Sequence, residues 1–183
     1  MAVYILLADG FEEAEALVPA DILIRAGIKV YLTAIGESLV VTGSHGVSVN
    51  ADIMKDKMDL SELEALVLPG GGKGTAALAS SDFVRQSINQ CVANGKYIGA
   101  ICAAPSILGS MGLLTGRRAV CFPSYEKFLD GSIITGNSVE HDDIFITAKA
   151  VGASFEFGFE LIRVLFGNDE AEKLRKGMYY KSN

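Results

Sequence analysis

The chain has 183 residues, half of them hydrophobic, and a formal net charge of −6 at pH 7. This length is sufficient for one well-buried domain and short for two, so we expect a single domain over residues 1–183. The negative charge and the lack of a basic run argue against a nucleic-acid-binding surface. No apolar run approaches the roughly 20 residues that a membrane-spanning helix needs.

The three cysteines, Cys91, Cys102 and Cys121, are odd in number and lack the spacing of a disulfide framework. Because the N-terminus also lacks a secretory leader, we expect a protein of the reducing cytoplasm. The two histidines, His45 and His141, are far apart in the sequence and form no spacing typical of metal ligands. We therefore expect no metal and no other cofactor.

Glu15 occupies an unusual position on the first predicted helix, which follows a buried strand at 2–8 and spans residues 11–26, with Pro19 predicting a kink or a restart. Burial would raise the pKa of the Glu15 carboxyl, which could then donate a hydrogen bond to a thiolate or pass a proton to a substrate. A side chain that bends out to solvent fits the sequence equally well. On a helical wheel, Glu15 shares its face with Val18, Pro19, Ile22 and Ala26.

The glycine-rich stretch Pro69–Gly74 follows a predicted strand at 65–68. It is not a P-loop, because Gly74 rather than Ser or Thr follows Lys73. It is not a dinucleotide-binding loop either, because Thr75 stands where a third glycine is required. Such a loop exposes backbone N–H groups that could stabilise an oxyanion, although a plain glycine turn is the simpler alternative.

The stretch Lys96–Pro105 predicts a buried strand that runs directly into a helix, with Cys102 at the bend. Ala100 and Ala104 are small enough for the sharp turn that a nucleophile on such a bend requires. The start of the following helix would favour the thiolate over the thiol. The alternative is that Cys102 is a small core residue, and the motif alone does not decide between the two.

The remaining segments complete an alternating pattern of strands and helices, which is typical of a parallel α/β sheet. We assign Cys91 and Cys121 to packing, and His45 and His141 to loops. Ser81 should cap a helix that points Val84, Ile88, Cys91 and Val92 inward. Further strands are predicted at 28–35, 119–122, 133–134 and 144–148, a hairpin at 39–49, a polar loop at 140–143, and helices at 153–166 and 169–176.

Four stretches together resemble the ThiJ/PfpI superfamily, most closely its small bacterial relatives of the parkinsonism-associated protein deglycase. The stretches span nearly the whole chain and keep the order of the family motifs. They are Gly10–Glu15 after the first strand, Leu68–Gly71 after the third, Ala100–Pro105 at the bend, and Gly152–Phe157 at the start of a late helix.

The resemblance implies a flavodoxin-like α/β sandwich, usually a homodimer, with Cys102 as nucleophile and Glu15 as its protonated partner. It also implies that the backbone N–H groups of Gly71 and Ala103 form an oxyanion pocket. A second apolar face of the first helix, with Ile24 on it, could serve the dimer contact. The resemblance favours the functional role of Cys102 over the core role.

The chain departs from the family pattern at two positions. Peptidase-like members have histidine directly after the cysteine, where this chain has Ala103, so we expect no peptidase activity. Other members have a pocket histidine directly before a proline, where this chain has Phe122 before Pro123. Any mechanism that requires that histidine is therefore in doubt.

Two functions agree with these residues. The first is a cofactor-free glyoxalase or deglycase that acts on methylglyoxal, glyoxal or early glycation adducts through Cys102 and Glu15. The second is a redox-responsive stress protein or chaperone that senses oxidation through Cys102. The expected partners are small aldehydes or glycated groups and a second copy of the chain.

Overall fold

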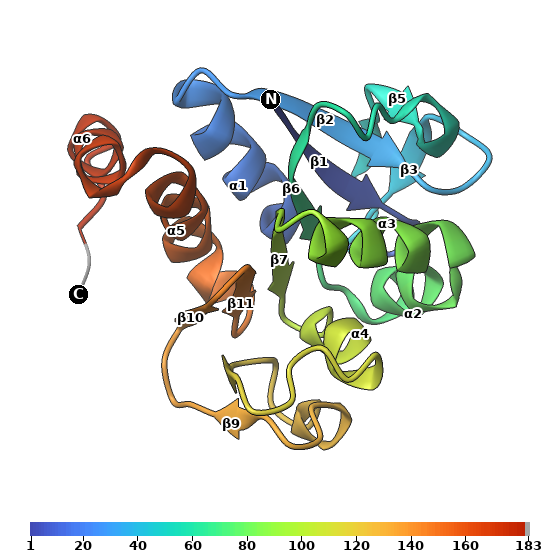
Figure 1. The fold of residues 1–183 in the computed structure, drawn as a ribbon. Helices are drawn as coiled ribbons and strands as arrows, with labels where there is room; N and C mark the ends of the chain where they lie inside the picture. The colour runs from blue at the N-terminus through green and yellow to red at the C-terminus, as the bar shows by residue number, and fades with distance from the viewer. Residues whose placement is uncertain (182–183) are drawn as a thin grey trace.

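The computed structural model describes residues 1–181 and shows an α/β sandwich around one seven-stranded sheet (Figure 1). All neighbouring strands in this sheet are parallel except β10 and β11, which are antiparallel at one edge. The predicted α/β sandwich with a mainly parallel sheet is confirmed. In spatial order the strands are β10 (Val139–Asp142), β11 (Phe145–Ala148), β7 (Tyr97–Ile101), β6 (Leu63–Leu68), β1 (Ala2–Leu7), β2 (Lys29–Ala34) and β5 (Ile53–Met54).

Helices cover both faces of the sheet because its central strands are apolar on both sides. On β1, Val3, Ile5 and Leu7 pack towards α1 (Glu13–Arg25) and α5 (Ser154–Phe166). Tyr4 and Leu6 pack in the second core with the other helices. These are α2 (Gly72–Ser80), α3 (Asp82–Ala93) and α4 (Pro105–Ser110), while α6 (Asn168–Gly177) packs on α5.

Short elements complete the chain. The predicted hairpin is confirmed as β3 (Val40–Thr42) paired antiparallel with β4 (Ser48–Asn50). The predicted strand at 119–122 is shorter, because only β8 (Arg118–Ala119) pairs with β9 (Ile133–Ile134). Single 3-10 turns are η1 (Lys55–Lys57), η2 (Glu126–Phe128) and η3 (Val151–Ala153). No helix within residues 1–181 is long and apolar enough to cross a membrane.

Two local predictions are wrong, and one of two alternatives is excluded for a third. The segment 140–143 is largely strand β10, because pairing with β11 satisfies its backbone while its polar side chains lie at the sheet edge. At Pro19 the sequence predicted a kink or a restart, and the restart is excluded because helix α1 continues through this residue. Val92 is 37% exposed, whereas Ser87 is buried on the inward face of α3. The Ser81 N-cap is confirmed, since its side chain accepts a hydrogen bond from the backbone N–H of Val84.

The topology brings three chain segments together at one edge of the sheet. Strand β6 lies between β1 and β7, and all three are parallel. Their carboxyl ends therefore meet at the same edge, which is where ligands bind in open α/β sheets. The segments that leave these ends are Gly10–Glu12, Pro69–Gly71 and Cys102–Ala104.

Candidate active site

Cys102 lies at the sharp bend that the sequence predicts. It follows β7 with φ of +65°, a left-handed backbone conformation that non-glycine residues rarely adopt. The bend is held on both sides, because the Cys102 N–H donates to the Ala148 carbonyl at 2.9 Å and the Cys102 carbonyl accepts from the Phe122 N–H at 2.7 Å. A strained residue held in this way is a recurrent feature of functional sites.

Glu15 points into the protein, so the solvent-facing alternative is excluded. It lies in the first turn of α1 and is only 1% exposed. Its Oε2 atom accepts a hydrogen bond of 3.0 Å from the backbone N–H of Gly70. Its Oε1 atom is buried and has no hydrogen-bond partner of ordinary geometry within residues 1–181. The carboxyl also interacts with the Cys102 side chain, because a hydrogen bond between the two groups affects the pKa of both.

Gly70 separates the acid from the cysteine. A Cβ atom at this position would lie 2.4 Å from Glu15 Oε2 and 2.6 Å from Cys102 Cβ. Both distances are far below van der Waals contact, so no side chain fits between the two groups. The glycine thus allows Glu15 and Cys102 to share one small volume, in which each affects the proton affinity of the other.

Two backbone N–H groups, those of Gly71 and Ala103, act on the sulfur of Cys102. Burial raises the pKa of this thiol, and hydrogen bonds from the two N–H groups oppose that rise. Gly71 reaches its place with φ of +88°, and a Cβ atom there would lie 2.3 Å from the Gly10 carbonyl oxygen. The structure thus brings together all four residues that the sequence predicts for the site.

Burial dominates the electrostatics of the pair. It raises the pKa of Glu15 to about 7, and the nearby Glu12 charge adds to this effect. Burial and then the charge of Glu15 raise the pKa of Cys102 to about 12. The expectation that the helix start lowers the thiol pKa is therefore not met while Glu15 is ionised, because burial and the carboxylate outweigh the two N–H groups.

The two groups titrate as a unit. Since the charge of either one opposes ionisation of the other, the pair loses one proton near pH 7 and the second only near pH 12. One negative charge is therefore shared by the sulfur and the carboxyl over this range. The Glu15 carboxyl, which accepts the Gly70 N–H, has the lower pKa of the two groups, while the N–H groups of Gly71 and Ala103 stabilise the thiolate that forms when the Cys102 proton moves to Glu15.

The other candidate residues lie outside this site. Cys91 and Cys121 are buried, as predicted, and burial raises the pKa of both thiols, to about 12 and about 11. His141 is on strand β10 rather than in a solvated loop, and its Nδ1 lies 2.9 Å from Nη2 of Arg163. Phe122 contacts the bend through its backbone and has an exposed side chain.

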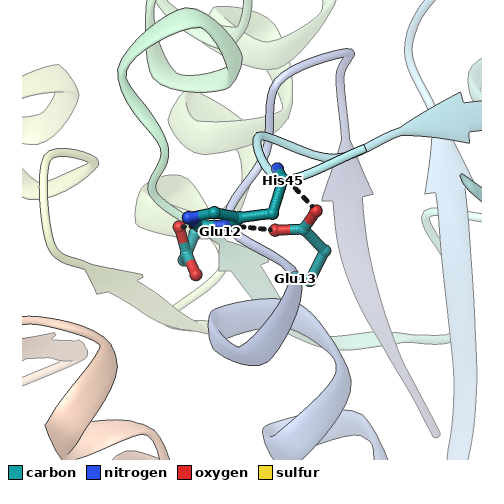
Figure 2. Close-up of side chains that lie close together, drawn as sticks. All are labelled: Glu12, Glu13 and His45. Atoms are coloured by element: carbon teal, nitrogen blue, oxygen red, sulfur yellow. Dashed lines mark hydrogen bonds and ion pairs between the residues drawn. The ribbon is translucent and has the colours of Figure 1, made fainter. Parts of the chain in front are cut away.

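His45 lies in the predicted hairpin loop but is fixed to the start of α1 (Figure 2). Its Nδ1 is 2.9 Å from Oε2 of Glu13 and 3.6 Å from Oε2 of Glu12, and its N–H donates to Oε1 of Glu13 at 2.8 Å. Ser44 Oγ lies within hydrogen-bond distance of both carboxylates. Although burial opposes it, hydrogen bonds led by that of His45 lower the pKa of Glu13 to about 2.

Glu12, Glu13 and His45 offer three potential metal ligands within 4.8 Å of one another. Their present partners fit an ion pair better than a metal ion. Both oxygens of Glu13 accept hydrogen bonds from Ser44, His45 or Val47, and the Glu13 bond raises the pKa of His45. A protonated imidazole cannot ligate a metal through Nδ1. The cluster therefore fastens the hairpin to α1.

Sequence reasoning missed two residues that shape the site. Gly70 was part of the Leu68–Gly71 motif, but its contact with Glu15 depends on a pairing 55 residues apart. Ser106 donates a hydrogen bond of 2.6 Å to the Ala103 carbonyl and so holds the peptide between Ala103 and Ala104. The signal for Ser106 was its place in the first turn of α4, one residue after Pro105.

Comparisons with known proteins match this chain to members of one family. The model of the DJ-1/PfpI family matches residues 1–164. Protein DJ-1 homolog B of Arabidopsis thaliana is 36% identical over 172 residues, which cover 93% of this chain and 39% of that longer protein. A deglycase of Pyrococcus abyssi is 35% identical over 167 residues, which cover 90% of this chain and 99% of that protein.

Two further proteins agree with this result. A glutathione-independent glyoxalase of Caenorhabditis elegans is 28% identical over 176 residues, which cover 96% of this chain and 94% of that protein. The crystal structure of a DJ-1 superfamily protein from Salmonella typhimurium, solved as a cysteine-to-alanine mutant, superposes with a TM-score of 0.93. It is 36% identical, and the match covers 99% of each chain.

Proposed function

Because the chain belongs to the DJ-1/PfpI family, we propose that it is a cofactor-independent enzyme of the glyoxalase and deglycase type. Its substrates are methylglyoxal, glyoxal or early glycation adducts, and its role is protection against carbonyl stress. The observation that supports this proposal is the pair of Cys102 and Glu15, which shares one charge beside the N–H groups of Gly71 and Ala103. The relatives named glyoxalase and deglycase agree with it.

The reaction begins when the Cys102 thiolate adds to the aldehyde carbon of methylglyoxal. The carbonyl electron pair moves to oxygen, and the N–H groups of Gly71 and Ala103 hold the resulting oxyanion. Glu15 gives its proton to that oxygen, which yields a neutral hemithioacetal.

The same carboxylate takes the proton from the former aldehyde carbon and gives it to the neighbouring carbonyl oxygen, which forms an enediol. It then takes the hydroxyl proton from the oxygen on the first carbon and delivers a proton to the second carbon, which forms a thioester of lactate. Water hydrolyses the thioester, releases lactate and returns the thiol. In sum, methylglyoxal and water give lactate, and glyoxal gives glycolate in the same way. Glu15 is the only side chain with a titratable group that this route requires besides Cys102.

The absence of histidine from two family positions sets limits on the activity. Ala103 follows the nucleophile and Phe122 precedes Pro123, so no imidazole at either position assists proton transfer. We therefore propose slow turnover and no peptidase activity. General acid–base assistance contributes roughly 100-fold to 10,000-fold where it is present, which is the scale of the loss.

The test is the rate of methylglyoxal loss and lactate formation in the wild-type protein and in Cys102→Ala and Glu15→Gln. Both substitutions should abolish turnover, with thermal unfolding showing that each variant is folded. Cys91→Ala and Glu37→Gln serve as matched controls, because they remove a thiol and a carboxylate outside the site. Unchanged turnover in both site variants would show that the proposal is wrong.

A second function, redox sensing in a stress protein or chaperone, is favoured by the exposure of the three thiols. Cys102 is partly exposed, whereas Cys91 and Cys121 are buried. The N–H groups of Gly71 and Ala103 and a protonated Glu15 could also stabilise a sulfinate on Cys102. Intact-mass and peptide analysis after mild peroxide treatment tests this. Oxidation of Cys91 or Cys121 while Cys102 stays reduced would exclude the sensor.

We also propose that residues 1–183 act as one domain in a cytoplasmic homodimer. The exposed apolar side chains of Ile24 on α1 and of Leu39, Val40 and Val47 on the hairpin support a subunit contact. Light scattering coupled to size-exclusion chromatography should give twice the chain mass of 19.4 kDa. Ile24→Glu should shift the mass towards the monomer, and a monomeric wild-type protein would exclude the dimer.

A further inference from the structure

A cavity lies beside the site, between helices α2 and α4 and turn η2. Its volume is about 240 Å³, and neither Cys102 nor Glu15 lines it. Gly72 and Ser106 do line it, and they follow Gly71 and Ala103 by one and three residues. The cavity is thus next to the oxyanion pocket in the chain but formed by other side chains.

The body of this cavity is apolar. Most of its lining comes from side chains that offer no hydrogen bond, and Phe128 packs on Tyr125 with ring centroids 5.8 Å apart. A ligand that fills it therefore needs a compact apolar part. The apolar lining side chains are Ala76, Leu78, Ala79, Ile107, Met111 and Phe128.

Thr75 supplies a hydroxyl without a partner in this apolar lining. The residue is 4% exposed, and its Oγ1 has no hydrogen-bond partner within the described part of the chain. A helical threonine can donate to the carbonyl three or four residues earlier, but the Thr75 hydroxyl makes no such bond within the described residues. A buried hydroxyl left without a partner destabilises the folded protein, and a hydrogen bond to an oxygen of a ligand would remove that cost.

Arg85 supplies a positive charge at the same cavity. Its guanidinium donates a single hydrogen bond to the Ala79 carbonyl at 3.1 Å, which leaves several N–H groups for a ligand. No carboxylate among residues 1–181 forms a salt bridge with it, although the protein carries an excess of negative charge. An uncompensated guanidinium beside an apolar cavity is suited to a carboxylate.

We propose that this cavity is a binding site for a small carboxylate with an apolar body. The carboxylate pairs with Arg85, an oxygen of the ligand bonds the Thr75 hydroxyl, and the body lies among the apolar side chains around Phe128. The site does not depend on the reaction proposed for Cys102. It could be occupied in a protein that lacks the sulfur.

The test is calorimetric titration of the full chain with phenylacetate, with phenylacetamide as the neutral probe of the same shape. We expect saturable 1:1 binding of phenylacetate and binding of the amide that is weaker by about tenfold or more. Arg85→Gln should weaken phenylacetate binding by a similar factor, whereas Lys149→Gln, which removes a positive charge elsewhere, should leave it unchanged. Cys102→Ala should also leave it unchanged.

Thr75 provides the second arm of the test. Thr75→Val keeps the shape but removes the hydroxyl, and should weaken phenylacetate binding by roughly threefold to tenfold. Thr75→Ser keeps the hydroxyl and should bind nearly as the wild type, even if packing is altered. Equal binding of acid and amide, unchanged affinity in Arg85→Gln, loss of binding in Cys102→Ala, or no saturable binding at all would each overturn the proposal.

Discussion

The backbone N–H of Gly70 donates a hydrogen bond of 3.0 Å to Oε2 of Glu15, across 55 residues of sequence. Gly70→Ala tests this contact, because its methyl group would lie 2.4 Å from that oxygen and must displace it. We expect a loss of about 1–3 kcal/mol in the free energy of unfolding and at least a tenfold loss of methylglyoxal turnover. Urea unfolding and the lactate assay measure the two effects.

The control for this substitution is Gly72→Ala, two residues further along the chain at the start of α2. A Cβ atom there meets nothing within 4 Å, and the backbone is not left-handed. This variant should match the wild type in stability and turnover. Equal effects at Gly70 and Gly72 would mean that loop flexibility matters rather than the contact with Glu15.

The raised pKa of Glu15 predicts how stability depends on pH. The folded protein holds this proton up to about pH 7, whereas the unfolded chain releases it near 4.5. The folded state therefore binds more protons between these values, so stability falls as the pH rises from 4.5 to 7, by about 3 kcal/mol for this shift. Urea unfolding across this range should show that fall in the wild type and a flatter curve in Glu15→Gln. Parallel curves would contradict the assigned pKa.

The shared charge predicts how Cys102 reacts with iodoacetamide. If the pair loses its first proton near pH 7 and its second near pH 12, the alkylation rate should rise towards pH 8 and then stay nearly flat to pH 10. Peptide mass spectrometry separates Cys102 from the buried Cys91 and Cys121, which should remain slow throughout. A rate for Cys102 that climbs tenfold for every pH unit from 7 to 10 would instead describe an isolated, buried thiol.

The ion pair between Glu13 and His45, called the hairpin clamp below, should contribute to the stability of the folded protein only while His45 is charged. Glu13 raises the pKa of His45, so the clamp stabilises the folded state below the ordinary value of 6.5. Its contribution is lost as the pH rises through the raised value. His45→Gln should therefore lower the urea midpoint at pH 6 and approach the wild type at pH 9. A difference that persists at pH 9 would show that the hydrogen bonds act without the charge.

Phe122→His tests whether the missing imidazole limits turnover. The Phe122 N–H already bonds the Cys102 carbonyl at 2.7 Å, so the backbone at this position is fixed beside the nucleophile. A histidine there should raise kcat by about tenfold or more for methylglyoxal, with a new pH dependence near 6.5. Phe122→Leu is the control for loss of the ring, and no gain in the histidine variant relative to it would show that proton transfer is not limiting.

Much of this fold could be predicted from local patterns in the sequence. The apolar runs that became β1 and β7, the Ser81 cap and the bend at Cys102 all depend on residues close in the chain. Strand β10 could not be predicted in this way. Its sequence is polar, and it forms a strand because its backbone pairs with β11 at the edge of the sheet.

The same distinction holds for the site. The small residues around Cys102 indicated its bend, and the family resemblance indicated Glu15, Gly71 and Ala103. The proton balance of the pair could not be predicted, because it depends on how deeply α1 buries the Glu15 carboxyl. The role of Gly70 could not be predicted either, because its neighbours Glu15 and Cys102 come from distant segments of the chain.

The left-handed backbone at Cys102 bears on why this position holds a cysteine. At φ of +65° a glycine would be relaxed and a cysteine is strained, so the residue best suited to the bend alone carries no sulfur. Cys102→Gly should therefore unfold less readily than the wild type and no longer carry out the reaction that needs the thiol. The thiol is better explained by reactivity than by architecture.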